Sequence, residues 1–120
     1  MTKKTVVLGA SQNPDRYSNM AVKKLAAYRH PVVAIGKREG NINGIEIIKG
    51  QPSLDDVDTV TLYLNPGNQK PYYDYILSLH PKRIIFNPGA ENEELEHMAK
   101  EKGIRTMDAC TLVLLSTEQY

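Results

Sequence analysis

The feature that most constrains the fold is the alternation of short apolar runs with segments of helical periodicity along the chain. The runs are rich in β-branched residues, and glycine, proline or asparagine follows most of them, as is typical of buried strands that end in tight turns. We expect strands at 5–8, 32–35, 58–64, 83–86 and 104–107, with a short edge strand at 45–48. We expect helices at 18–29, 72–79 and 92–102, and a last one near 112–119.

This alternation predicts a parallel sheet, because a crossover between parallel strands needs a connection, usually a helix, that returns the chain. We therefore predict a doubly wound, Rossmann-like α/β fold with a mainly parallel sheet of five to six strands and helices on both faces. The chain has 120 residues, and neither a linker nor a low-complexity tract interrupts it. We expect residues 1–120 to form a single domain.

The composition narrows the classes of partner. Lys and Arg number 15 against 14 Asp and Glu, so no broad positive field is available to grip a nucleic acid. No apolar stretch approaches the roughly 20 residues that span a bilayer, and the residues before Thr5 lead directly into a strand rather than forming a signal peptide. Cys110 is the single cysteine, so no internal disulfide can form. We expect a cytoplasmic protein that binds neither nucleic acid nor membrane.

The first strand is followed by a loop suited to phosphate binding. Ligands of open parallel sheets bind at the carboxyl ends of the strands, where this chain places loops 9–17, 65–69 and 87–92. In the first loop, Gly9 allows close approach of the main chain and Ser11 can donate a hydroxyl. The following helix offers unpaired amides and the positive end of its dipole, and Arg16 adds a full charge. This combination predicts a pyrophosphate site, with an ordinary strand-to-helix turn as the alternative.

The same region does not match the dinucleotide fingerprint, because three spaced glycines are missing after the first strand. The second strand also ends in Gly36, Lys37 and Arg38, where NAD proteins usually place a carboxylate for the ribose hydroxyls. Two cations at that position indicate a ribose phosphate, with a solvated loop as the alternative. The pattern therefore weakens an NAD site and favours a nucleotide whose ribose carries a phosphate, such as NADP.

Several segments together resemble the small CoA-binding domain family. Gly-Ala-Ser-Gln-Asn-Pro-Asp-Arg-Tyr-Ser at 9–18 is similar to the family's phosphate loop, and 50–54 and 87–94 are similar to its later loops. Cys110 follows the last strand, as in many members. The resemblance covers nearly the whole chain, although Gly36-Lys37 stands where relatives commonly show Asn-Pro, and Asn87-Pro88 replaces an aliphatic or Gln pair.

The resemblance implies a Rossmann fold related to the nucleotide-binding domain of succinyl-CoA synthetase. It places the pyrophosphate of CoA on the first loop, and it makes the third loop a second candidate contact. With the two cations after the second strand, the candidate cofactor-binding residues are Gly9, Ala10, Ser11, Pro14, Arg16, Lys37, Arg38, Asn87, Pro88 and Gly89.

No arrangement of side chains predicts a catalytic or metal site, since the histidines and carboxylates lack the spacing of a base, nucleophile or ligand set. Cys110 is a candidate for contact with the thiol of CoA, with a buried small side chain as the alternative. We therefore expect non-catalytic binding of CoA or an acyl-CoA. The alternatives are an NADP-binding or acyl-CoA-acting enzyme subunit that needs a partner, and a CoA- or redox-sensing interaction protein. A protein partner or a homo-oligomer is compatible with each.

Overall fold

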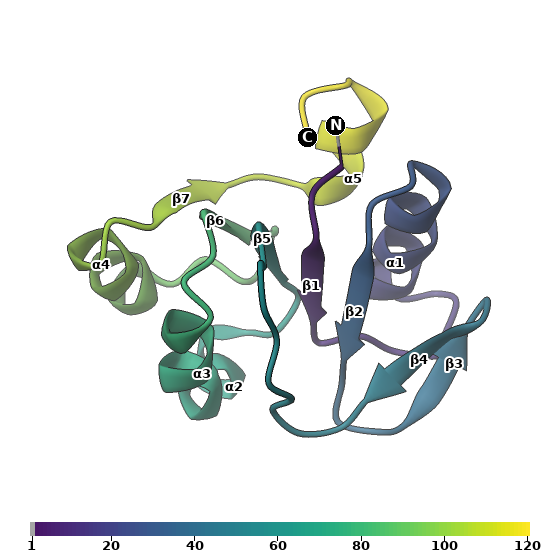
Figure 1. Cartoon of the computed structure of the whole chain (residues 1–120), viewed down its shortest axis with the longest axis horizontal. Coiled ribbons are helices and arrows are strands. Elements are labelled where there is room, and N and C mark those ends of the chain that lie inside the picture. The colour runs from purple at the N-terminus through teal and green to yellow at the C-terminus, as the bar shows by residue number, and fades with distance from the viewer. Residues whose placement is uncertain (1) are drawn as a thin grey trace.

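The computed structural model describes residues 2–120, which form a seven-stranded sheet flanked by helices (Figure 1). The strand order is β3-β4-β2-β1-β5-β6-β7. All neighbours are parallel except the β3–β4 pair, which is an antiparallel hairpin. The strands are β1 (Thr5–Leu8), β2 (Val32–Ile35), β3 (Gly40–Ile42), β4 (Ile45–Ile48), β5 (Thr59–Leu62), β6 (Arg83–Phe86) and β7 (Arg105–Asp108). The helices are α1 (Tyr17–Ala27), α2 (Pro66–Gln69), η1 (Lys70–Tyr72), α3 (Tyr73–Ser78), α4 (Glu93–Glu101) and α5 (Thr111–Ser116).

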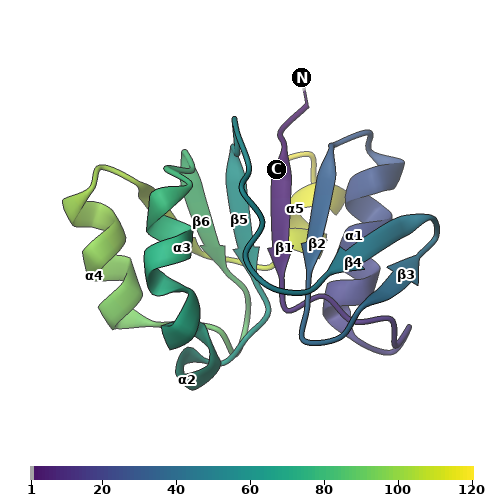
Figure 2. The ribbon, with the colours of Figure 1, turned by 60° about the horizontal axis from the view of Figure 1, so that its bottom comes forward.

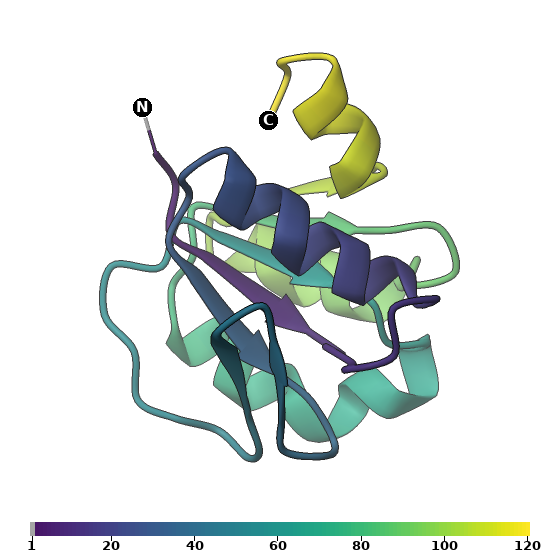
Figure 3. The same ribbon diagram turned by 90° about the vertical axis from the view of Figure 1, so that its right-hand side faces the viewer.

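Helices cover both faces of the sheet, which confirms the doubly wound α/β fold. On one face, Leu8, Val60 and Phe86 pack against residues of α3 and α4, such as Ile76 and Leu95. On the other face, apolar residues of β1, β2 and β4 pack against α1 and α5. Figure 2 shows α3 in front of the sheet and α5 behind it, and Figure 3 shows α5 beside α1. Among residues 2–120, no helix is long and apolar enough to span a bilayer.

The strand count is higher than the expected five to six because the segment 36–44 contains a strand, β3, that was not predicted from its Gly- and Asn-rich sequence. Gly40 and Asn41 are poor strand formers, yet β3 pairs with β4 through the register Gly40 to Ile47 and Ile42 to Ile45. As a result β4 lies inside the sheet, paired with β2 on its other side, and the prediction of an edge strand at 45–48 is wrong.

The connection from β4 to β5 crosses the sheet without a helix. Residues 49–58 run as an irregular segment in front of the sheet (Figure 2). Val57 is buried in the core on this face and Leu54 packs against it, while the Tyr75 hydroxyl donates to the Pro52 carbonyl at 2.6 Å. These contacts allow a loop to cover the part of the sheet that a crossover helix covers in most such folds.

At the amino edge of the sheet, Tyr120 packs on residues from three separate segments. Its ring centroid lies 4.9 Å from that of His30 and 4.3 Å from the guanidinium carbon of the buried Arg83. The Arg83 Nε donates to the Thr59 hydroxyl at 2.7 Å, and His30 Nδ1 accepts from the main-chain nitrogen of Lys3 at 2.9 Å. Because that nitrogen is a donor, Nδ1 must be unprotonated in the folded protein.

We expect acid to destabilise the protein partly through His30. Burial, followed by the charge of Lys3, lowers the pKa of His30 below its usual 6.5. The folded state therefore binds fewer protons than the unfolded state, and the free energy of unfolding falls as the pH drops below about 6.5, until the folded pKa is passed. Thermal melts of the wild type and of His30→Asn, which keeps an acceptor, measure this. The wild type should lose more stability than the variant between pH 7 and pH 5, and equal losses would contradict the prediction.

Candidate functional site

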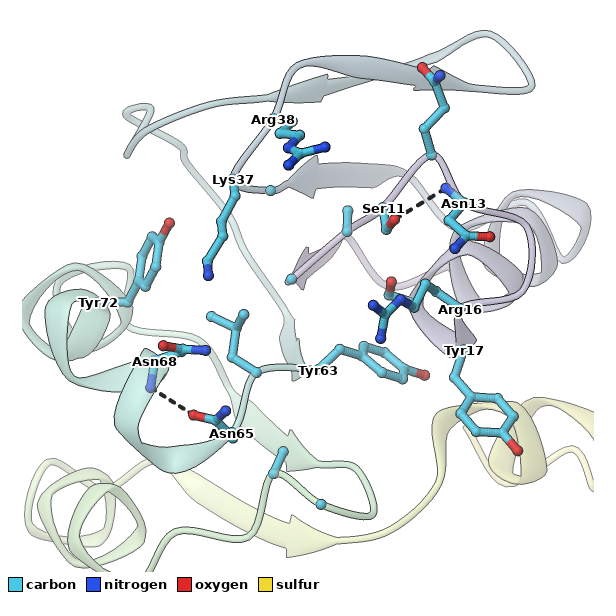
Figure 4. Close-up of a pocket in the computed structure, with 18 of the residues that line it drawn as sticks. Ser11, Asn13, Arg16, Tyr17, Lys37, Arg38, Tyr63, Asn65, Asn68 and Tyr72 are labelled. Atoms are coloured by element: carbon cyan, nitrogen blue, oxygen red, sulfur yellow. Dashed lines mark hydrogen bonds between the residues drawn. The ribbon is translucent and has the colours of Figure 1, made fainter.

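A cleft of about 1210 Å³ lies at the carboxyl edge of the sheet, where the strand order reverses between β1 and β5. Open α/β sheets bind ligands at this point. The three predicted loops all contribute to its lining, together with residues that follow β2 and β4 (Figure 4). Of the predicted contacts, the cleft is lined by Gly9, Ala10, Ser11, Arg16, Lys37, Arg38, Pro88 and Gly89.

The sharp exit of the chain from β1 depends on Gly9. Its φ is +100°, in the region that favours glycine. A Cβ at this position would also lie 3.1 Å from the Tyr63 carbonyl carbon and 3.1 Å from the Leu64 side chain. The first loop can therefore pass close over the end of β5 only with glycine here.

The structure shows which amides of the first loop are available to a ligand. The main-chain nitrogens of Gly9 and Ala10 both donate to the Ile35 carbonyl at 2.9 Å, so they extend the β1–β2 pairing. Among the described residues, the main-chain nitrogens of four residues at the loop and helix start have no hydrogen-bond partner: Ser11, Gln12, Tyr17 and Ser18. The unpartnered amides of this loop thus begin at Ser11, two residues after Gly9.

The rest of the first loop is held in place by its own polar side chains. The Ser11 hydroxyl oxygen accepts from the Asn13 nitrogen at 3.1 Å, and Asn13 Oδ1 accepts from the Asp15 nitrogen at 3.0 Å. The side chain of Asn19, buried in the first turn of α1, donates to the Ser11 carbonyl at 3.0 Å. Since the Ser11 oxygen is already an acceptor, its hydroxyl hydrogen can point into the cleft beside Arg16 (Figure 4).

Lys37 and Arg38 enter the cleft from the opposite side, on the loop after β2. Figure 4 shows Lys37 extending toward Asn68 and Tyr72, and Arg16 near Ser11 at the other end of the view. The loop starts at Gly36, where a Cβ would lie 2.3 Å from the Ala10 carbonyl oxygen. The cationic loop and the first loop are therefore packed main chain against main chain.

A fully buried glutamine connects the second and third loops below the cleft. Gln69 Nε2 donates to the carbonyls of Leu64 and Ala90, each at 2.8 Å, and its Oε1 accepts from Asn92 Nδ2 at 2.9 Å. Asn92 also donates to the Tyr73 hydroxyl, and it caps α4 by accepting from the Leu95 nitrogen. Burial is the main cause that raises the pKa of Tyr73, so this hydroxyl stays protonated and donates to Glu94.

Asn87 has a structural role in the third loop. It is buried, donates to the Thr61 hydroxyl and the Leu62 carbonyl, and accepts from the Thr111 nitrogen at 2.9 Å. These bonds hold the start of α5 against β5. Asn87, Pro14 and Cys110 are not among the residues that line the cleft, while Pro88 and Gly89, next to Asn87, are.

Several lining residues were not predicted from the sequence, notably Gln12, Tyr63, Asn68 and Tyr72. Asn68 lies in the second predicted loop, so its place could have been inferred from the fold. Tyr63 looked like a strand residue, but β5 ends at Leu62. Its hydroxyl is buried without a hydrogen bond among the described residues, and burial raises its pKa.

The fold and the cleft define the class of protein: an α/β domain of the Rossmann type with a cleft at the strand-order reversal. The family model for the CoA binding domain matches residues 3–116. The chain belongs to this CoA-binding domain family. No match was found among proteins with curated functions.

Solved structures share the fold of this chain. A crystal structure of an uncharacterized protein is 48% identical, with a TM-score of 0.97 over 100% of this chain and 99% of that one. A hypothetical protein from Pyrococcus horikoshii OT3 is 22% identical, with a TM-score of 0.83 over 93% and 80%. The dinucleotide forming acetyl-coenzyme A synthetase 1 of Ca. Korarchaeum cryptofilum, in complex with phosphate and ADP, is 20% identical, with a TM-score of 0.70 over 90% of this chain and 26% of that one. The last two show similarity of fold alone.

Proposed function

We propose that the chain binds coenzyme A in this cleft, with the pyrophosphate against the first loop and the start of α1. The observation that carries the proposal is the set of four amides without a partner among the described residues, beside Arg16, in a chain of the CoA-binding family. They are those of Ser11, Gln12, Tyr17 and Ser18. Amides at a helix start and a guanidinium are the groups that bind phosphate oxygens most readily in proteins.

The ribose phosphate of CoA is then assigned to Lys37 and Arg38. These cations face the first loop across the cleft, and Gly36 fixes their loop directly against Ala10. NADP is the second candidate, because it also combines a pyrophosphate with a phosphate on the adenosine ribose. CoA is favoured by the family, and the two ligands differ in which ribose oxygen carries the phosphate.

Binding without catalysis fits the side chains of the cleft. Within residues 2–120, those that line it include one carboxylate, Glu39, and neither histidine nor cysteine. A positioned acid, base or nucleophile would be needed for acyl transfer. A partner protein could supply such a group, and in that case the chain would act as a CoA-binding subunit.

Removing both cations is expected to weaken CoA binding by about 30-fold and dephospho-CoA binding by less than about 3-fold. Two exposed charge-assisted contacts of about 1 kcal/mol each account for this difference, and dephospho-CoA lacks the phosphate that they bind. Isothermal titration calorimetry of the wild type and of Lys37→Ala/Arg38→Ala, with CoA, dephospho-CoA, NAD and NADP, measures it. The wild type should bind CoA more tightly than dephospho-CoA or NAD.

A matched control removes the same charge elsewhere. Lys100→Ala/Lys102→Ala changes two cations in or next to α4, outside the cleft, and should leave CoA affinity nearly unchanged. Equal affinity of the wild type for all four ligands, or no binding of any, would refute the proposed function. Tighter binding of NADP than of CoA would support the second candidate.

A further inference from the structure

The loop between β1 and α1 is joined to the β3–β4 hairpin by the side chain of Gln12, which is not among the predicted cofactor-binding residues. Gln12 Oε1 accepts from the main-chain nitrogen of Asn41, in β3, at 2.9 Å. β3 is the last strand of the sheet and has no neighbour on its outer side, so its outward main-chain donors need partners from outside the sheet. Gln12 supplies one of them.

Gly40 makes room for this contact. A Cβ on Gly40 would lie 2.5 Å from Gln12 Oε1, 3.2 Å from its Cδ and 3.4 Å from its Cβ. The φ of Gly40 is not positive, so the backbone conformation itself does not require glycine. The close approach of the Gln12 side chain is therefore the local reason for the small residue at this position.

The two contacts define both ends of the cationic loop. Residues 37–39 connect Gly36 to Gly40, with Gly36 packed on the Ala10 carbonyl and Gly40 packed on Gln12. Both partners belong to the first loop. The spacing between the first loop and Lys37 and Arg38 is thus set by one contact at the end of β2 and one at β3.

We propose that Gln12 is a positioning residue that fixes the distance between the two phosphate-binding loops, and through it the preference for a ligand with a third phosphate. The inference rests on the proposed function, because it assigns the pyrophosphate to one loop and the ribose phosphate to the other. Gln12 acts by holding the start of the β3–β4 hairpin against the first loop. The loop with Lys37 and Arg38, which directly precedes the hairpin, is thereby held close to the first loop as well.

The test is the ratio of the dissociation constants for dephospho-CoA and CoA, measured by calorimetry on the full chain. Gln12→Met keeps the bulk of the side chain and removes the acceptor, and it should lower this ratio about 3- to 10-fold, since one exposed hydrogen bond contributes about 0.5–1.5 kcal/mol. Affinity for dephospho-CoA should change little. A general loss of fold would lower both affinities together and leave the ratio unchanged.

Gly40→Ala should lower the ratio to a similar degree, because the new methyl group displaces the Gln12 side chain. In Gln12→Ala/Gly40→Ala the obstructing atoms are gone, so the double variant should be no worse than Gln12→Ala alone. Glu46→Gln, on the neighbouring β4 opposite Asn41, is the control and should keep the wild-type ratio. Thermal melts should show that every variant is folded at the temperature of the titration.

Two results would overturn the inference while leaving the proposed function intact. The first is a Gln12→Met protein with the same ratio of dissociation constants as the wild type. The second is a Gln12→Ala/Gly40→Ala protein whose ratio falls by the combined effects of the two single substitutions. A wild type that binds neither ligand would instead refute the proposed function, and one that binds both equally would refute its assignment of the ribose phosphate to Lys37 and Arg38. The two failures are therefore distinguishable in the same set of titrations.

Discussion

Replacing Gly36 by alanine should lower the free energy of unfolding by about 3 kcal/mol and weaken CoA binding at least about tenfold. The added Cβ would lie 2.3 Å from the Ala10 carbonyl oxygen and 3.0 Å from the Ile47 side chain. The nearest atom belongs to the main chain, so no side-chain rotation relieves the overlap. Overpacking of this kind costs about 1–3 kcal/mol or more, and the loop after β1 must move away from β2.

That movement affects stability and binding through the same atoms. The nitrogens of Gly9 and Ala10 both donate to the carbonyl of Ile35, which directly precedes Gly36, so displacing the loop strains these two hydrogen bonds. The free amides that begin at Ser11 would move with it. Chemical denaturation gives the stability, and calorimetry with CoA gives the affinity at a temperature where the variant is folded.

Gly67→Ala provides the comparison for this experiment. The methyl group it adds would meet only Asn65 Oδ1, at an ordinary 3.5 Å, and Gly67 lies in α2, where alanine is favoured over glycine. This variant should be as stable as the wild type or slightly more so. If Gly36→Ala were equally stable and bound CoA equally well, close packing between the loops would not be what requires glycine at position 36.

Most of the fold follows from local sequence patterns because the central strands are fully buried. β1, β5 and β6 are buried at every position, and apart from Arg83 at the start of β6 their residues are all apolar or β-branched. β3 does not, since an edge hairpin needs only one partner and tolerates glycine and asparagine. The short α2 was also missed, because its start depends on the Asn65 side chain, which caps the Asn68 nitrogen.

The sequence predicts where the cleft lies better than it predicts which main-chain groups are free to donate hydrogen bonds there. Gly9, Arg16 and Lys37 are recognisable because their chemistry follows from residue type and from position at a strand end. The pairing of the Gly9 and Ala10 amides with Ile35 depends on how two strands twist past each other. Contacts between segments distant in the chain, such as Gln12 with Asn41, leave no periodic signal. Asn87 was predicted as a ligand contact because it is a polar residue in a loop after a strand. In the structure it is buried, and its hydrogen bonds go to other residues of the protein.

Gln69 is the second residue whose replacement should have a large effect. It is fully buried, and its three hydrogen bonds all go to groups of the second and third loops. Leucine has a similar volume but no polar atoms, so Gln69→Leu leaves the carbonyls of Leu64 and Ala90 and one donor of Asn92 without these partners. Buried polar groups without partners cost about 1–3 kcal/mol each.

We therefore expect Gln69→Leu to lower the free energy of unfolding by about 3 kcal/mol, which corresponds to a fall of roughly 12 °C in Tm. Gln119→Leu, an exposed glutamine near the end of the chain, is the matched control and should change Tm by less than about 2 °C. Gln69→Glu should be less destabilised at pH 5 than at pH 8, because only the protonated carboxyl can donate to a carbonyl. A Gln69→Leu protein as stable as the control would mean that the loops hold their positions without the glutamine, and that the lining residues Asn68 and Ala90 are placed by other contacts.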